Sequence, residues 1–268
     1  MRKIFIYIFV LISICMIIPI MCTKKFRTKT IFSEVKNEKQ IENVQKYDYS
    51  KISTIKLLHT KTNEVEEVPL DEYLCNVIAA EMPVDFELEA IKAQAVVART
   101  YTIYKISKDS SKHENADICD SANCCQAWIS KEDRYAKWNK EEADDNWNKI
   151  VRAVNETLGQ IITYEGLPIN AVFHSNSGGK TEIASNVWNG GDYPYLQSVE
   201  TSGEDTYTQY ESEVILTKNK LKEKFLENYK DFTINFEEED AIKILEYTDS
   251  GRVRTIKIGN KNISRSTT

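Results

Sequence analysis

Residues 70–105, with the sequence LDEYLCNVIAAEMPVDFELEAIKAQAVVARTYTIYK, are the most strongly patterned part of the chain. Apolar side chains first recur at helical spacing and form one stripe that finishes with a carboxylate: Leu70, Tyr73, Leu74, Val77, Ile78 and Glu81. Met82-Pro83 must stop this helix, because proline lacks a backbone donor and restricts the residue before it. Asp85 is placed to cap a second helix, which runs to about Lys105 and has one face made of Leu88, Ile91, Ala95, Ala98 and Thr102.

Over the rest of the chain, helices and strands alternate without the regular rhythm of a parallel sheet. Upstream, the alternation of Ile52, Thr54, Lys56 and Leu58 predicts a strand. Downstream, a third helix is predicted to end at Gly159, with apolar residues at Trp147, Ile150, Val151, Val154 and Leu158. The other predicted elements are a hairpin (160–164 and 169–174, turning at 165–168), a helix (218–228) and a strand pair that turns at 249–251. We therefore expect a single mixed α+β domain over residues 53–268.

The composition is that of an ordinary globular protein, with 268 residues of which 41% are hydrophobic and 28% are charged. One domain of medium size is long enough to bury a hydrophobic core. The net charge of −6 gives no general electrostatic reason to expect nucleic acid or another polyanion as a partner.

The N-terminal segment is apolar enough to span a membrane. Ile4–Met21 holds eighteen residues without a charge, and a helix of about 20 residues crosses the hydrocarbon layer. A cleaved signal peptide is the alternative, but no small-x-small cleavage site follows the run. We expect an uncleaved membrane anchor over residues 1–22 and a polar tether over residues 23–52. By the positive-inside rule, the basic residues after the span favour a cytoplasmic domain (Lys24, Lys25, Arg27 and Lys29).

Glu81 is the strongest candidate for chemistry. Burial disfavours a charged carboxylate, so a carboxyl group on the apolar side of a helix is expected to keep its proton. A protonated carboxyl group is what general-acid catalysis requires. The alternative is a structural residue at the rim of the helix or in an ion pair.

Lys92 and Arg99 are seven residues apart, which puts them on one helical face about 10.5 Å from each other. Such a pair could hold an acidic or acetamido group of a sugar, or could fix a catalytic carboxylate. The alternative is an ordinary solvated face.

Four potential metal ligands, His113, Cys119, Cys124 and Cys125, lie within thirteen residues. Thiolates with an imidazole suit Zn²⁺, and four such ligands form a closed structural site. The alternatives are free thiols or a disulfide from Cys119 to Cys124 or to Cys125. A closed site also argues against a zinc hydrolase, which needs an open coordination position.

A glycine-rich turn with the sequence HSNSGG is predicted at residues 174–179, directly after a strand. Ser175 and Ser177 are its two hydroxyl groups. They either donate hydrogen bonds to a sugar or serve only the turn itself.

Four stretches of the sequence together resemble the SpoIID/LytB family of sporulation proteins. They are DEYLCNVIAAEMP (71–83), EAIKAQAVVARTY (89–101), FHSNSGGKT (173–181) and YLQSV (195–199). The similarity spans roughly residues 53–260, and the Glu-Met-Pro and Lys-Ala-Gln-Ala motifs are specific when they occur together.

This resemblance implies a lytic transglycosylase that cleaves peptide-free peptidoglycan strands during engulfment of the forespore. It places the catalytic glutamate at Glu81 and basic substrate-site residues at Lys92 and Arg99. In such a reaction the 6-hydroxyl of muramic acid attacks its own anomeric carbon, so one carboxyl group suffices where hydrolases generally use two. The product is a 1,6-anhydromuramyl end.

The resemblance also implies a location and partners. The domain would lie outside the mother-cell membrane, facing the forespore, and would work with a cell-wall amidase and a polytopic membrane protein. This conflicts with the charges after the anchor, and the resemblance is the more specific of the two signals. The alternative function is a non-catalytic glycan-binding scaffold that activates the amidase.

Two features depart from the family's pattern. Where family members have this segment, their metal-ligand spacing resembles His-x5-Cys-x4-His-Cys, so Cys124 stands where a histidine would be. Family members also continue past the position of Thr268 and carry a Gly-His-Gly-Val-Gly-Met-Ser-Gln block that this sequence lacks. We therefore expect a shortened C-terminal part of the domain.

Overall fold

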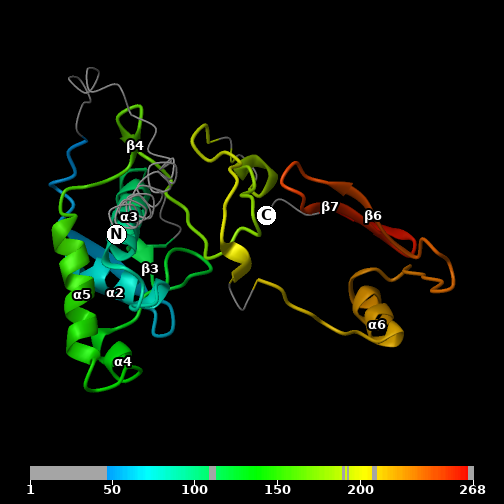
Figure 1. The fold of residues 1–268 in the computed structure, drawn as a ribbon, viewed down its shortest axis with the longest axis horizontal. Coiled ribbons are helices and arrows are strands. Elements are labelled where there is room, and N and C mark those ends of the chain that lie inside the picture. Colours follow the sequence, from blue (N-terminus) through cyan, green and yellow to red (C-terminus); the bar gives the residue numbers. More distant parts are fainter. Residues whose placement is uncertain (1–46, 109–112, 189–190, 192, 207–209, 265–268) are drawn as a thin grey trace, which may run out of the picture. The chain divides into compact units, whose positions relative to one another are not determined.

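The computed structural model describes residues 47–264 except for 109–112, 189–190, 192 and 207–209 (Figure 1). Helices and strands are mixed in this part of the chain, which confirms the predicted α+β class. The predicted anchor and most of the predicted tether lie outside the described residues. Among the residues that are described, no helix has both the length and the apolar composition needed to cross a membrane.

The elements follow one another as short strands and helices of very different length. In chain order they are β1 (Thr54–His59), β2 (Glu64–Pro69), α2 (Leu70–Glu81), α3 (Leu88–Ser107), β3 (Ile118–Cys119), α4 (Lys131–Tyr135), α5 (Ala143–Glu156), β4 (Thr163–Tyr164), β5 (Leu167–Pro168), the 3₁₀ turns η1 (Ala184–Asn186) and η2 (Glu204–Thr206), α6 (Lys218–Asn228), β6 (Ile242–Tyr247), β7 (Val253–Ile258) and β8 (Lys261–Ser264).

Helices α2, α3 and α5 pack against one another and form the centre of the core (Figure 1). The predicted apolar stripes face inward: Tyr73, Leu74, Val77, Ile78, Ile91, Ala95, Ala98, Ile150 and Val154 are all at most 1% exposed. The alanines of α3 keep its buried face flat, which allows neighbouring elements to approach closely. Helix α2 ends at Glu81 and Met82 is extended, as expected for a residue before proline.

A small sheet with the strand order β2-β1-β3 lies next to these helices in the core. Strand β1 pairs with β2 antiparallel and with β3 parallel. The residues of β1 that enter the core are Ile55 and Leu57. The strand was predicted from the alternation of Ile52, Thr54, Lys56 and Leu58. Its buried side chains, Ile55 and Leu57, are instead the residues that alternate with these.

Three further details differ from the sequence prediction. Helix α3 begins after Glu87, with no side-chain cap, so Asp85 is not the cap. The hairpin pairs Thr163–Tyr164 with Leu167–Pro168, so the predicted second strand at 169–174 is wrong. The turn is made by Glu165 and Gly166 alone, which both have positive φ, and Leu167–Pro168 are therefore in the strand and not in the turn. Strand β2 was not predicted because its sequence, EVEEVP, carries little apolar signal.

The C-terminal part holds α6 and an antiparallel sheet with the order β6-β7-β8. Helix α6 spans the predicted residues, and β6 and β7 turn where predicted. This turn contacts the glycine-rich turn: the Arg252 guanidinium donates to the carbonyl oxygens of Ser177 at 2.5 Å and Lys180 at 2.9 Å.

Candidate active site

Glu81, the last residue of α2, is half-buried and lines three cavities. One of them, of about 430 Å³, is also lined by Asp85, Arg134 and Glu142, and the other two meet at Glu81. We call the first of these two the Tyr193 cavity; it has a volume of about 840 Å³ and is also lined by Tyr101, Lys105, Asn170, Trp188 and Tyr193. The second is the Gln94 cavity, with a volume of about 520 Å³, lined by Met82, Phe86, Gln94, Ser175 and Asn176. Glu81, Phe173 and His174 line both cavities. Among the described residues, no other carboxylate lines the Tyr193 cavity or the Gln94 cavity.

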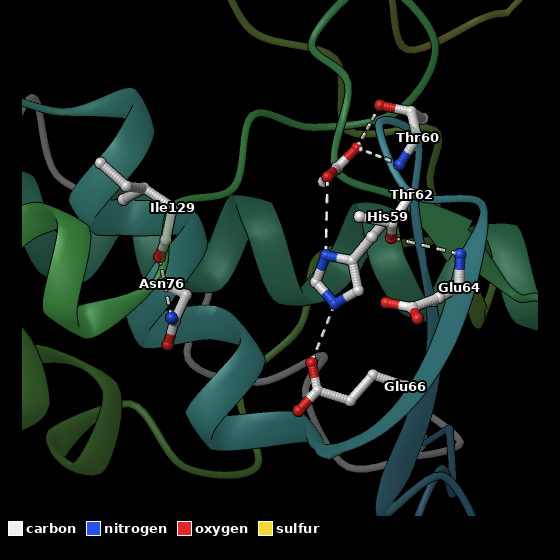
Figure 2. A network of polar contacts seen from close by, with 8 residues as sticks. His59, Thr60, Thr62, Glu64, Glu66, Asn76 and Ile129 are labelled. Carbon is white, nitrogen blue, oxygen red and sulfur yellow. Dashed lines mark hydrogen bonds and ion pairs between the residues drawn. The ribbon is translucent and has the colours of Figure 1, made fainter.

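A short segment that packs against α2 fixes the carboxylate. The backbone N–H of Ala127 donates to Glu81 Oε1 at 2.7 Å. This segment is attached to the helix on both sides of Ala127. Asn76 Nδ2 donates to the carbonyl of Ile129 at 2.8 Å (Figure 2), and Gln126 Nε2 donates to the hydroxyl of Tyr73 at 3.2 Å. Because the donor is held by its neighbours, Glu81 is restricted to one orientation.

The turn that follows Glu81 is held from α5. Lys149 Nζ donates to the carbonyls of Val84 at 2.8 Å and Phe86 at 2.7 Å. These bonds satisfy backbone acceptors between two helices, where no helical partner is available. They also hold the backbone of Phe86, whose side chain lines the Gln94 cavity.

Glu204 organises the glycine-rich turn on the far side of the cavities. Its carboxylate accepts hydrogen bonds from the backbone N–H groups of Gly179 and Ser177 and from the hydroxyls of Ser177 and Thr201, at 2.7–2.9 Å. The Gly179 N–H is the largest of the causes that lower the Glu204 pKa to about 2. Gly178 and Gly179 adopt positive φ in this turn, a conformation that glycine adopts without strain. The turn positions His174 and Ser175 beside Glu81.

The two predicted serines lie in different places. Ser175 lines the Gln94 cavity with Glu81, as the substrate-site prediction requires. Ser177 is 6% exposed, and its hydroxyl is bonded to Glu204 and Thr201. Ser177 therefore serves the turn in this structure, and its role in substrate binding stays a prediction.

The two predicted basic residues do not line the cavities around Glu81. Lys92 forms ion pairs with Glu89 at 2.7 Å and with Glu156. Arg99 is 1% exposed, and its guanidinium donates to carbonyls at the C-terminal end of α5, Val154 at 3.1 Å and Thr157 at 2.8 Å. Lys105 shares the Tyr193 cavity with Glu81, and its Nζ lies 5.5 Å from the ring centroid of Tyr101.

The four predicted metal ligands come together. One ligand atom from each of His113, Cys119, Cys124 and Cys125 lies within 4.8 Å of all the others. The Cys124 and Cys125 sulfurs are 3.9 Å apart, and His113 Nε2 is 3.4 Å and 3.6 Å from them. For tetrahedral zinc with Zn–S bonds near 2.3 Å, neighbouring sulfurs are about 3.8 Å apart. The donor set and its spacing fit such an ion, which the residues of this cluster would hold without an open position.

The described cysteines are free thiols, so neither of the two disulfides considered from the sequence is formed. Burial raises the pKa of the Cys125 thiol to about 12 and raises that of Cys119 as well. Without a cation these thiols would stay protonated at neutral pH. A metal ion is therefore what would turn the cluster into a strong crosslink.

The residue that follows Cys119 in the sequence connects the Cys/His cluster to the end of strand β1. Asp120, next to Cys119, accepts hydrogen bonds from the backbone N–H of Thr60 at 3.0 Å and its hydroxyl at 2.6 Å. His59 lies between Asp120 and Glu66 in the same network (Figure 2), 2.9 Å from the Glu66 carboxylate. Cys124 and Cys125 in turn line the Tyr193 cavity. The cluster thus links β1 to one wall of the candidate active site.

Comparison with known proteins identifies the family that this part of the chain resembles. Residues 58–164, which contain Glu81 and the whole Cys/His cluster, match the SpoIID family, described as "Stage II sporulation protein". The chain therefore contains a SpoIID-family domain. It is 37% identical over 158 residues to the stage II sporulation protein D of Bacillus amyloliquefaciens, covering 59% of this chain and 45% of the relative. It is 33% identical over 172 residues to the Bacillus subtilis (strain 168) protein of the same name, covering 64% of this chain and 50% of that relative.

A third relative is named after an amidase. It is the amidase enhancer of Bacillus subtilis (strain 168), 34% identical over 123 residues, or 46% of this chain and 14% of the relative. The chain spans about half the length of the stage II sporulation proteins that it matches. The similarity therefore concerns the part of a SpoIID protein that contains Glu81.

Sequence reasoning missed several residues that the structure brings to Glu81. Gln94 had a signal, since it is the glutamine of the Lys-Ala-Gln-Ala motif. Asn170, Trp188 and Tyr193 had none, because loops far along the chain carry them into the Tyr193 cavity. The N–H of Ala127 is a backbone group, which no sequence pattern reveals.

Proposed function

We propose that this chain is a lytic transglycosylase that cleaves peptide-free peptidoglycan strands in sporulation, with Glu81 as its acid and base. The observation that carries the proposal is one oriented carboxylate at the junction of two cavities, with no second carboxylate among the described residues that line them. Two adjoining cavities suit a polymer with sugars on both sides of the bond that is cut.

A single carboxylate is sufficient for this reaction. Glu81 gives its proton to the glycosidic oxygen as the bond from that oxygen to the anomeric carbon breaks. The 6-hydroxyl oxygen of the same muramic acid then bonds to the anomeric carbon and returns its proton to Glu81. The products are a 1,6-anhydromuramyl end and a free 4-hydroxyl. No water is consumed, so no second carboxylate is required to activate one.

Other residues of the site would bind and orient the glycan. Trp188, Tyr193 and Phe173 offer apolar surfaces for the faces of sugar rings. Ser175 offers a hydroxyl, and Lys105 an ammonium group for the lactyl carboxylate that a peptide-free muramic acid exposes. Lys92 and Arg99 are left out of this set, because one is ion-paired outside the cavities and the other is buried.

The setting of the enzyme belongs to the same proposal. The apolar N-terminal run would anchor the domain to the mother-cell membrane, on the side that faces the forespore. A cell-wall amidase that removes stem peptides would supply the substrate, and the relative named amidase enhancer supports a link of this kind. The Cys/His cluster would hold a structural Zn²⁺ that supports the wall of the Tyr193 cavity.

The test is digestion of peptide-free glycan strands in ¹⁸O-labelled water, followed by mass spectrometry of the new ends. The proposal predicts anhydro ends that carry no label, since water takes no part in the reaction. Labelled reducing ends would show a hydrolase instead.

The amidase-enhancer relative also favours a second candidate, a scaffold that binds glycan and stimulates an amidase without cutting. It predicts glycan binding and faster release of peptides by an added sporulation amidase, with no anhydro ends. The digestion experiment separates the two candidates directly.

A further inference from the structure

Buried polar atoms without a hydrogen-bond partner gather near Glu81. In the part of the chain that the structure describes, five side-chain nitrogen or oxygen atoms are in this state. Two of them belong to residues that line the two cavities: Gln94 Nε2 in the Gln94 cavity and Asn170 Oδ1 in the Tyr193 cavity. One is a donor and the other is an acceptor.

Such atoms need an explanation, since proteins rarely leave them unpaired. An unsatisfied buried donor or acceptor costs about 1–3 kcal/mol. The nearby amide of Asn76 donates to a carbonyl. Gln126 Nε2 donates to two hydroxyls, while Gln126 Oε1 is another of the five unpaired atoms and lines neither cavity. The unpaired amide atoms of Gln94 and Asn170 differ from that of Gln126 because their residues line the cavities that Glu81 also lines, which points to a ligand that pairs with them.

The two atoms and their surroundings restrict the chemistry of that ligand. A phosphate or carboxylate offers acceptors only, which would leave Asn170 Oδ1 without a partner. A secondary amide offers a carbonyl for Gln94 Nε2 and an N–H for Asn170 Oδ1. An N-acetyl group adds a methyl, and each cavity has exposed aromatic rings to contact one: Phe86 and Phe173, each 37% exposed, in the Gln94 cavity and Trp188, 40% exposed, in the Tyr193 cavity.

We propose that Gln94 and Asn170 are specificity-determining residues that each bind an N-acetyl group of the glycan, one in each cavity that meets at Glu81. This inference rests on the proposed function for the identity of the ligand as a glycan. It adds that the site recognises N-acetylated sugars on both sides of the bond at Glu81, and that these two side-chain amides, 76 positions apart in the chain, perform the recognition.

The experiment measures binding by calorimetry to two neutral tetrasaccharides, one of β-1,4-linked N-acetylglucosamine and one of β-1,4-linked glucose. All proteins carry Glu81→Gln, so that no turnover disturbs the measurement. The variants are Gln94→Leu and Asn170→Leu, which keep the approximate size of the side chain and remove its polar atoms. The matched control is Gln160→Leu, an exposed glutamine that lines neither cavity.

We expect the parent to prefer the N-acetylated tetrasaccharide. Each cavity variant should lose about 5–10-fold in affinity for it, the worth of roughly one hydrogen bond, and should keep the parent's affinity for the glucose polymer. The control should behave as the parent does. Because Gln94 Nε2 is unpaired in the free protein, Gln94→Leu should also melt at or above the temperature of the parent.

Unchanged affinity for the N-acetylated tetrasaccharide in both variants would overturn the inference, and so would a parent that binds neither polymer. A fall in turnover of Gln94→Leu in the wild-type background, without a fall in affinity, would also overturn it and would make Gln94 a positioning residue for Glu81. The two proposals fail separately. Amide-dependent binding without anhydro ends from the wild type would leave this inference intact and contradict the transglycosylase.

Discussion

Replacement of Arg99 by alanine should destabilise the domain rather than merely weaken substrate binding. The guanidinium is buried at the C-terminal end of α5, where it donates to Val154 O, to Thr157 O and Oγ1, and at 3.4 Å to Gln160 O. Its charge also complements the negative end of the helix dipole, and Asp71 lies 3.9 Å away.

The expected loss follows from these contacts. A hydrogen bond that involves a charged group contributes about 1.5–3 kcal/mol, and removal of one partner from a buried charged network costs about 3–5 kcal/mol. Arg99→Ala would leave several carbonyls of the α5 terminus unpaired together with a cavity, so we expect a loss of about 3–5 kcal/mol. For a domain of this size, that corresponds to a fall in melting temperature of about 6–20 °C.

Urea and thermal unfolding of the purified protein, followed by circular dichroism, measure this loss. Arg99→Lys keeps the charge but presents fewer donors in a different geometry, so its midpoint should lie between those of the wild type and the alanine variant. The reasoning would be refuted if Arg99→Ala melted with the wild type and lost only its affinity for glycan. That result would return Arg99 to the substrate site.

Three shorter predictions concern other parts of the site. Metal analysis should find one Zn²⁺ per chain. Cys119→Ser or a chelator should lower the melting temperature without abolishing cleavage by the protein that remains folded. A chelator that leaves the melting temperature unchanged would exclude a structural metal. Since the Glu204 pKa is lowered from 4.5 to about 2, its stabilisation is complete above pH 4.5 and is lost as the pH falls toward 2. The gap between the melting temperatures of the wild type and Glu204→Gln should therefore close over this range, and a gap that is independent of pH would contradict the assignment. Lys92→Ala, which breaks the surface ion pairs with Glu89 and Glu156, should change both melting and turnover little, and a large drop in turnover alone would restore Lys92 to the substrate site.

The sequence predicted the parts of the fold that short-range patterns determine. The apolar stripe that ends at Glu81 predicts α2, because every third or fourth residue of a helix faces the same neighbours. Met82-Pro83 ends this helix through the local properties of proline, which needs no knowledge of the tertiary structure. The Cys/His cluster was equally accessible, because its four ligands lie within thirteen residues and one loop brings them together. Strand β2, with glutamates at half of its positions, offered no such pattern.

The surroundings of Glu81 depend on contacts between distant segments, and periodicity carries no information about these. The seven-residue spacing correctly put Lys92 and Arg99 on α3, but it could not show that α5 would present its terminal carbonyls to Arg99. Neither could it show that Asn170, in a loop beyond the hairpin, would share a cavity with Glu81. The family resemblance located the carboxylate, and only the tertiary structure shows which groups face it.

The most direct test of the account is the rate at which Glu81→Gln produces anhydro ends from peptide-free glycan strands. Glutamine keeps the shape of the side chain and can still accept the Ala127 N–H, but it cannot exchange a proton. General acid–base catalysis contributes about 10²–10⁴-fold, so the account predicts a loss of at least about 10²-fold, with an unchanged circular dichroism spectrum and melting temperature. A folded Glu81→Gln variant that forms anhydro ends at nearly the wild-type rate would show that Glu81 is not the catalyst.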